Sequence, residues 1–214
     1  MSEVLKLHQS NASPNSRRVR IYLSERGIPA ELVPVDLGSK EQFSDAYAMI
    51  NPRKVVPTLV LEDGTAIGEV PAIQRYLEEA FPAHQLGGTT PKEKALIGMW
   101  DRRMELEGFA AVMETVRNAA SGLAGRAISG PHFYEQIPAL VERGKERVRD
   151  FYADLEQRLA ANNFVAGNTF SIADITAVVT VDFATKALSI AIPGENEATH
   201  RWYAAVSARP SFSA

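Results

Sequence analysis

Over the first eighty residues the spacing of hydrophobic positions changes repeatedly, which indicates strands alternating with helices. Residues 4–8, VLKLH, alternate apolar and polar positions as a short strand does. Residues 16–27, SRRVRIYLSERG, carry apolar side chains on one helical face and end at Gly27, a residue suited to a left-handed helix stop. Residues 30–37, AELVPVDL, predict a second strand, and Pro34 places it at a sheet edge or bulge.

The next segments complete an α/β unit. Residues 43–52, FSDAYAMINP, predict a short helix that ends before the proline. Residues 57–69, PTLVLEDGTAIGE, predict a hairpin that turns at Asp63-Gly64. Residues 70–81, VPAIQRYLEEAF, predict a closing helix. The expected order is β-α-β-α-β-β-α, with the first two strands parallel because a helix crosses between them.

Beyond this unit the spacing becomes helical. Residues 92–119 and 139–161 carry apolar side chains at helical intervals, and residues 121–138 contain the glycines and prolines of a loop. We expect an α/β domain over residues 1–80, a linker rich in Pro, Gly and Thr over 81–91, and an all-helical domain over 92–214.

A helix start is also predicted inside the helical half, at FVAGNTFSIADIT. Ser171 and Asp174 form a capping-box pattern, and Phe170 and Ile175 occupy the positions of a hydrophobic staple. A carboxylate within an apolar run also suggests catalysis. We interpret Asp174 as a structural cap because the first N–H groups of a helix need an acceptor.

Composition narrows the function classes. The 214 residues are 45% hydrophobic and 23% charged, with a net charge of −3, which argues against a nucleic-acid partner. There is no apolar run of roughly 18 residues and no signal-peptide pattern, so we expect a soluble cytoplasmic protein without a membrane partner. With no cysteine, the chain has no thiol nucleophile and no disulfide, and its four histidines lack metal-ligand spacing. We expect no metal.

The segment SNASPNSRRVR, residues 10–20, places hydroxyls and amides where a basic helix begins. A helix N-terminus attracts anions, because its N–H groups are unpaired and its dipole is positive there. Ser13 before Pro14 is also an ordinary N-cap followed by proline at the first helical position. The residues alone leave both readings open.

Three segments in this order and spacing, SPNSRRVRIYLSERGI, NPRKVVPTLVLEDGTAIGEVPAIQRYLEE and FVAGNTFSIADITA, resemble the cytosolic glutathione S-transferases. The opening segment is most similar to bacterial serine- or asparagine-type forms, of the nu-, theta- or zeta-like groups. The resemblance implies a thioredoxin-like N-terminal domain followed by an all-α C-terminal helical domain. It also implies glutathione as a co-substrate and a twofold homodimer.

The resemblance assigns roles to particular residues. Ser13 matches the catalytic serine, and Ser13-Pro14-Asn15 matches the T-P-N tripeptide that contacts the glutathione sulfur in nu-like forms, so Ser13 and Asn15 are the catalytic candidates. Val56-Pro57 matches the dipeptide with a cis proline whose preceding backbone pairs with the cysteinyl residue. The glutathione-binding candidates are Lys54, Val56, Pro57, Glu69 and Val70.

Val70 departs from the family pattern, which has a serine there that contacts the γ-glutamyl carboxylate. Without the resemblance, Lys54 would be interpreted as a surface lysine and Glu69 as a helix cap. The electrophile is expected to bind between the domains, against the first long helix of the helical domain. The candidates there are Trp100, Arg103, Met104 and Val112.

The predicted function is a glutathione transferase, in which the bound thiolate attacks a small electrophile. Two alternatives remain. A glutathione-dependent disulfide reductase or peroxidase would use the same site on a disulfide substrate. A non-catalytic binding protein would keep the fold without the chemistry.

Overall fold

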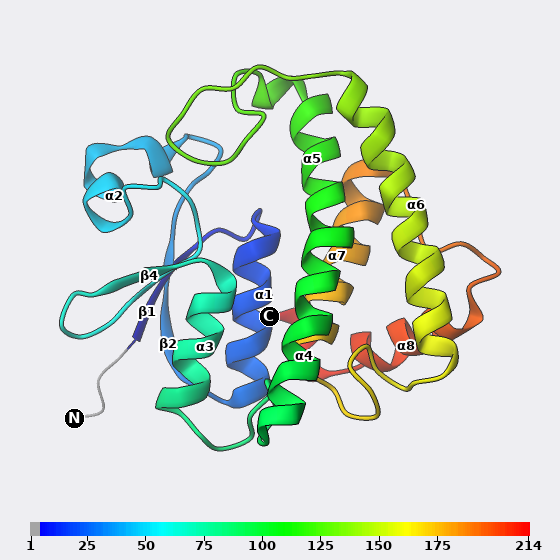
Figure 1. Ribbon diagram of the computed structural model, residues 1–214. Coiled ribbons are helices and arrows are strands. Elements are labelled where there is room, and N and C mark those ends of the chain that lie inside the picture. Colours follow the sequence, from blue (N-terminus) through cyan, green and yellow to red (C-terminus); the bar gives the residue numbers. More distant parts are fainter. Residues whose placement is uncertain (1–4) are drawn as a thin grey trace. The chain divides into compact units, whose positions relative to one another are not determined.

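The computed structural model describes residues 5–214 and divides them into two compact units (Figure 1). The first unit contains the chain up to Gln85, together with residues 129–132 and the last two residues. The second contains Leu86–Ile128 and Phe133–Phe212. Val4, which the sequence assigns to the first strand, lies outside the described residues.

The first unit is a thioredoxin-like domain built on a four-stranded sheet in the order β2-β1-β3-β4. Strand β1 is parallel to β2 and antiparallel to β3, and β3 is antiparallel to β4. This confirms the predicted fold class, the helical crossover, the hairpin and the edge position of the second strand. The elements are β1 (Leu5–Gln9), α1 (Pro14–Arg26), β2 (Ala30–Pro34), η1 (Glu41–Phe43), α2 (Asp45–Ile50), β3 (Thr58–Val60), β4 (Ala66–Gly68) and α3 (Val70–Ala80).

Helix α1 follows its sequence signals closely. It starts at Pro14 after the N-cap Ser13, and it stops at Gly27, which has a left-handed φ of 59°. Val19 and Tyr22 are fully buried on the face predicted to pack. Gly27 suits the stop because it lacks the Cβ that makes this conformation costly for other residues.

Helices α1 and α3 lie on one face of the sheet (Figure 1), and a buried polar cluster joins them. Glu78 of α3 accepts hydrogen bonds from Tyr22 Oη at 2.7 Å and from Arg26 Nη1 at 2.8 Å. Arg26 also donates to the carbonyls of Phe81 and Ala83, beyond the end of α3. The guanidinium thus neutralises a carboxylate that burial alone would make costly.

The second unit is all-helical and confirms the predicted class. Its elements are α4 (Pro91–Arg103), η2 (Met104–Phe109), α5 (Ala110–Ala119), η3 (Ser121–Leu123), α6 (Ala139–Ala160), α7 (Ile172–Leu188), α8 (Glu197–Ser207) and η4 (Pro210–Ser213). Among the residues that the structure describes, no helix combines the length and apolar content required to cross a bilayer.

One difference from the predicted helix over 92–119 is a π-helical segment, η2, at its centre. Gly108 lies there against the ring of Phe151 from α6, and a Cβ at Gly108 would be 2.5 Å from Cε2 of that ring. A wider helical turn with a glycine at the contact accommodates the ring. Hydrophobic periodicity cannot reveal such a turn, because it is a tertiary packing feature.

The capping box at the start of α7 is confirmed. Oδ2 of Asp174 accepts from the backbone N–H of Ser171 at 2.9 Å and from its hydroxyl at 3.0 Å. Oδ1 accepts from Val165 N at 2.8 Å and from Trp202 Nε1 at 2.9 Å. Burial raises the pKa of Asp174 to about 6, against the opposing effect of these hydrogen bonds. Asp174 therefore joins α7 to α8 and to the preceding loop as well as capping its own helix.

Asp174→Ala is expected to destabilise the protein by about 3–5 kcal/mol, because each buried donor left without a partner costs about 1–3 kcal/mol. That exceeds the roughly 0.5–2 kcal/mol of an ordinary cap. Urea denaturation measures the difference. Asp150→Ala, which removes an exposed carboxylate from α6, is the control and should stay within about 0.5 kcal/mol. A loss below about 1 kcal/mol for Asp174→Ala would show that the hydrogen bonds are dispensable.

Candidate active site

Strand register brings three loops of the first unit to the same edge of the sheet. His8, near the end of β1, is paired with Thr58 at the start of β3, and Thr58 is paired with Gly68 at the end of β4. The segment before α1, the Val56-Pro57 dipeptide and Glu69 each adjoin one of these three positions. The structure therefore gathers the candidates for sulfur and peptide contact at one edge.

A closed set of hydrogen bonds shapes the loop between β1 and α1. Ser10 donates its N–H to Oγ of Ser16 at 3.3 Å, and its carbonyl accepts from Ser13 N at 3.0 Å. Ser16 in turn donates its N–H to Oγ of Ser13 at 3.2 Å. Each serine thus fixes another one, and the loop presents the start of α1 in a defined conformation.

Ser13 is an N-cap, and this role does not exclude a second one. The cap uses a lone pair of its oxygen, while the hydroxyl proton remains available for donation. The side chain is mostly buried, with 8% of the residue exposed. The two readings of Ser13 that the sequence left open are therefore compatible.

Asn15 is half-buried in the first turn of α1, and its Oδ1 accepts from Nη1 of Arg18 at 3.3 Å. Within residues 5–214 its Nδ2 makes no hydrogen bond. Arg18 is fully buried, although arginine side chains are usually exposed. The reason is that Arg18 turns inward and forms a hydrogen bond with its own helix.

Arg20 adds positive charge next to the loop. Its Nη1 donates to Oε1 of Gln9 at 2.6 Å and to the carbonyl of Ser10 at 3.4 Å. Burial, followed by the nearby charge of Arg17, lowers the pKa of Arg20. The first turn of α1 contains no acidic side chain. The helix dipole and the arginine charge therefore make the start of α1 favourable for an anion.

The loop before β3 contains the predicted cis Val56-Pro57 bond. Asn51 holds this loop, because its Nδ2 donates to the carbonyl of Val55 at 3.1 Å and to Oγ1 of Thr58 at 2.8 Å. Tyr47 Oη donates to the same carbonyl at 2.7 Å. Within the described part of the chain the backbone groups of Val56 have no partner, so they are available to an extended peptide.

Lys54 and Glu69 both have left-handed backbone angles, with φ of 56° and 63°. Lys54 is half-buried, with its Nζ 6.0 Å from the ring centroid of Phe43. Glu69 is exposed and precedes α3, yet its side chain makes no capping hydrogen bond. The strained backbone and the unused carboxylate favour a ligand contact over the cap interpretation of Glu69. Val70, the first residue of α3, is buried.

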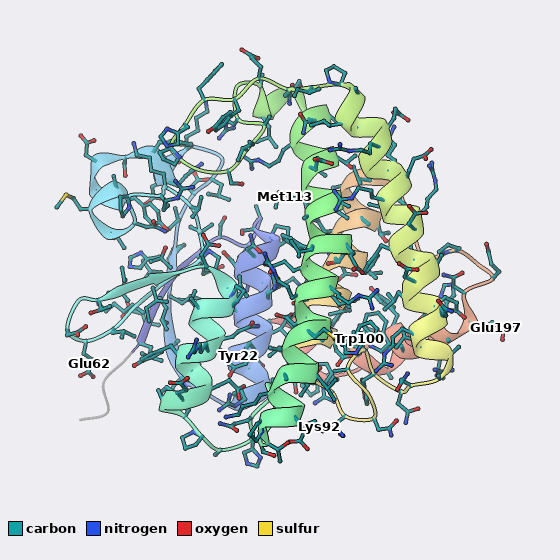
Figure 2. The ribbon with its side chains drawn as sticks, viewed as in Figure 1. Tyr22, Glu62, Lys92, Trp100, Met113 and Glu197 are labelled. Atoms are coloured by element: carbon teal, nitrogen blue, oxygen red, sulfur yellow. The ribbon has the colours of Figure 1, made fainter. Side chains whose placement is uncertain are left out.

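Three of the four electrophile-pocket candidates lie together in the second unit. Trp100, which is labelled in Figure 2, lines a pocket of about 250 Å³ together with Arg103, Met104 and residues of α6. The Trp100 ring has the guanidinium carbons of Arg103 and Arg158 at 4.7 Å and 4.2 Å from its centroid. Val112 does not line this pocket, because it is fully buried in the helical core.

Both halves of the chain are similar to known proteins. The model of the glutathione S-transferase N-terminal domain matches residues 7–86, and that of the C-terminal domain matches residues 138–205. The chain is 32% identical to glutathione S-transferase 2 of Saccharomyces cerevisiae, over 99% of this chain and 89% of that protein. The chain belongs to the glutathione S-transferase family.

Solved structures of other family members superpose over nearly the whole chain. A glutathione S-transferase domain-containing protein from Marinobacter aquaeolei is 36% identical, with a TM-score of 0.88 over 96% of this chain and 98% of that one. A Gtt2-class transferase of Vibrio parahaemolyticus is 32% identical, with a TM-score of 0.83 over 98% and 96%. These similarities support glutathione transferase activity for this chain.

Sequence reasoning missed three residues that hold the loops of the candidate site in place, namely Asn51, Tyr47 and Arg20. Asn51 had a usable signal, since asparagine before proline is typical of a turn that the amide stabilises. Tyr47 and Arg20 had none, because their partners are 8 and 11 residues away in sequence.

Proposed function

We propose that this glutathione S-transferase binds glutathione at the sheet edge formed by α1, the cis-proline loop and α3, and that it ionises the glutathione thiol for attack on a small electrophile. The observation that carries the proposal is the start of α1, where unused donors, buried arginines and the helix dipole converge with no acidic group in the first turn.

The required stabilisation is within reach of these groups. A thiol with a pKa near 8.5 needs roughly 2 kcal/mol of preference for its thiolate to titrate near 7. A helix N-terminus contributes about 0.3–1 kcal/mol. A hydrogen bond to a charged atom contributes about 1.5–3 kcal/mol. One donor from Ser13 or Asn15, added to the dipole, is sufficient.

The rest of the tripeptide has suitable partners. The backbone of Val56 would pair with the cysteinyl residue, Glu69 would bind the γ-glutamyl amine, and Lys54 would bind the glycine carboxylate. Val70 removes a hydroxyl from the γ-glutamyl end, and the N–H groups at the start of α3 would hold that carboxylate instead.

Conjugation to an electrophile is better supported than the two alternatives. Disulfide reduction would use the same site with a second glutathione, and an assay with a small organic disulfide distinguishes it from conjugation to an aryl halide. A purely non-catalytic role is opposed by the amide nitrogen of Asn15, which has no hydrogen-bond partner among residues 5–214.

A cytoplasmic homodimer is also part of the proposal. Helix α4 and the adjoining η2 expose a row of apolar side chains at Leu96, Met99 and Leu106, each between 42% and 46% exposed. Such a row favours a protein partner, and a second copy of the chain would give a closed twofold interface.

The first prediction concerns glutathione affinity. Glu69→Gln should weaken binding at least about tenfold, because a hydrogen bond to a charged group contributes about 1.5–3 kcal/mol. Glu62→Gln removes a glutamate from the hairpin (Figure 2) and serves as the control with unchanged affinity. Isothermal titration with glutathione measures both. Equal affinity for the two variants would remove Glu69 from the site.

The second prediction concerns the thiol. Ser13→Ala and Asn15→Ala should together raise the pKa of bound glutathione by about one unit or more, at ~1.4 kcal/mol per unit. Activity should fall most steeply below neutral pH, because the less acidic thiol is protonated there. A pH–rate profile and ultraviolet absorbance of the thiolate report the change. A double variant with the wild-type profile would show that the sulfur is activated elsewhere or not at all.

The third prediction concerns assembly. Sedimentation at micromolar concentration should show a dimer, and Leu106→Glu should shift it toward the 23.4 kDa monomer by burying a charge at the interface. Glu195→Gln, an exposed position before α8, is the control. A wild-type protein that sediments only as the monomer contradicts this proposal.

A further inference from the structure

Ser13 and Asn15 differ in what they have left to offer a thiolate. Ser13 already accepts the N–H of Ser16 through its oxygen, and its single proton can rotate among several acceptors. Asn15 has its oxygen occupied by Arg18, while both protons of its amide nitrogen are without a partner among residues 5–214. The amide is therefore the more strongly oriented donor of the two.

The orientation of this amide follows from the chemistry of arginine. A guanidinium carries only donors, so the atom of Asn15 that faces Arg18 must be its oxygen. The nitrogen then has to face the opposite side of the carboxamide. Arg18 is three residues further along α1, which places the two side chains on neighbouring positions of one helix face.

Arg18 is well suited to hold that orientation. It is fully buried, so the residues packed around its side chain restrict its movement. Arg20, the other buried arginine in this part of α1, donates to Gln9 and Ser10 and makes no hydrogen bond to Asn15. The two arginines thus act on different parts of the site.

We propose that Arg18 is a positioning residue, which fixes the carboxamide of Asn15 with its nitrogen toward the glutathione sulfur. This inference rests on the proposed function, since it needs a thiolate at the start of α1. It explains how Asn15 would stabilise the thiolate. An amide that rotated freely would turn its oxygen toward the anion part of the time, and the oxygen would repel the anion.

A double-mutant cycle tests the coupling. The four proteins are wild type, Asn15→Ala, Arg18→Met and the double variant, each saturated with glutathione and titrated by ultraviolet absorbance of the thiolate. In the wild-type background Asn15→Ala should raise the thiol pKa by about one unit. In the Arg18→Met background the same change should raise it by less than about a third of a unit, because the amide is no longer oriented.

Arg20→Met is the matched control. It removes a buried arginine of the same helix that does not touch Asn15, so Asn15→Ala should keep its full effect in that background. If the effect is also full in the Arg18→Met background, Arg18 acts only through its charge or its packing, and the proposal is overturned.

Arg18→Lys keeps the experiment decisive if Arg18→Met does not fold. Lysine retains the charge but replaces the rigid planar fork by one mobile ammonium. A reduced effect of Asn15→Ala in this background supports positioning, and a full effect overturns it.

The same variants distinguish a failure of the positioning proposal from a failure of the proposed thiol activation. If Asn15→Ala leaves the pKa unchanged in the wild-type background, the positioning proposal is overturned. The Ser13→Ala variant then shows whether thiol activation at α1 persists without Asn15, because only a raised pKa for Ser13→Ala would retain the proposed function.

Discussion

The register of three neighbouring strands is the constraint on which the site depends. His8 pairs with Thr58, and Thr58 pairs with Gly68, so the end of β1, the start of β3 and the end of β4 share one edge of the sheet. A slip of one residue in any of these strands would turn its side chains to the other face and shift its loop relative to the other two. Asn51 reinforces this register, because its amide binds Thr58 Oγ1 and the carbonyl just before Val56-Pro57.

The start of α1 combines several arginines with the positive end of the helix dipole. Basic side chains near a helix N-terminus oppose the dipole, and this helix has arginines at 17, 18 and 20 with no acid in its first turn. Arg18 and Arg20 are buried and hydrogen-bonded to groups of the loop and of the first turn. This arrangement fits the proposed binding of the glutathione thiolate at the start of α1.

Asp174, in the helical unit, is a buried carboxylate whose role is structural. It is fully buried, and among the described residues it accepts four hydrogen bonds, from Val165, Ser171 and Trp202. Its carboxylate oxygens pair with donors of the surrounding chain, which indicates a structural role. Burial raises its pKa to about 6, but this shift does not change that interpretation. Nδ2 of Asn15 and the carboxylate of Glu69 differ, since neither has a hydrogen-bond partner among residues 5–214, and this contrast distinguishes a buried structural polar group from candidate ligand-binding groups.

Local patterns by themselves determined the fold class, the α1 stop at Gly27 and the capping box at Ser171, since each depends on residues within a few positions of one another. Resemblance to the family added the candidates at Ser13, Asn15, Val56 and Glu69. Only tertiary structure decided that Arg18 is buried and bound to Asn15, and that the helix over 92–119 contains a π segment. It also decided that Val112 belongs to the core and not to the pocket beside Trp100. Those outcomes depend on which distant side chains pack together, and hydrophobic spacing along one segment carries no information about its packing partners.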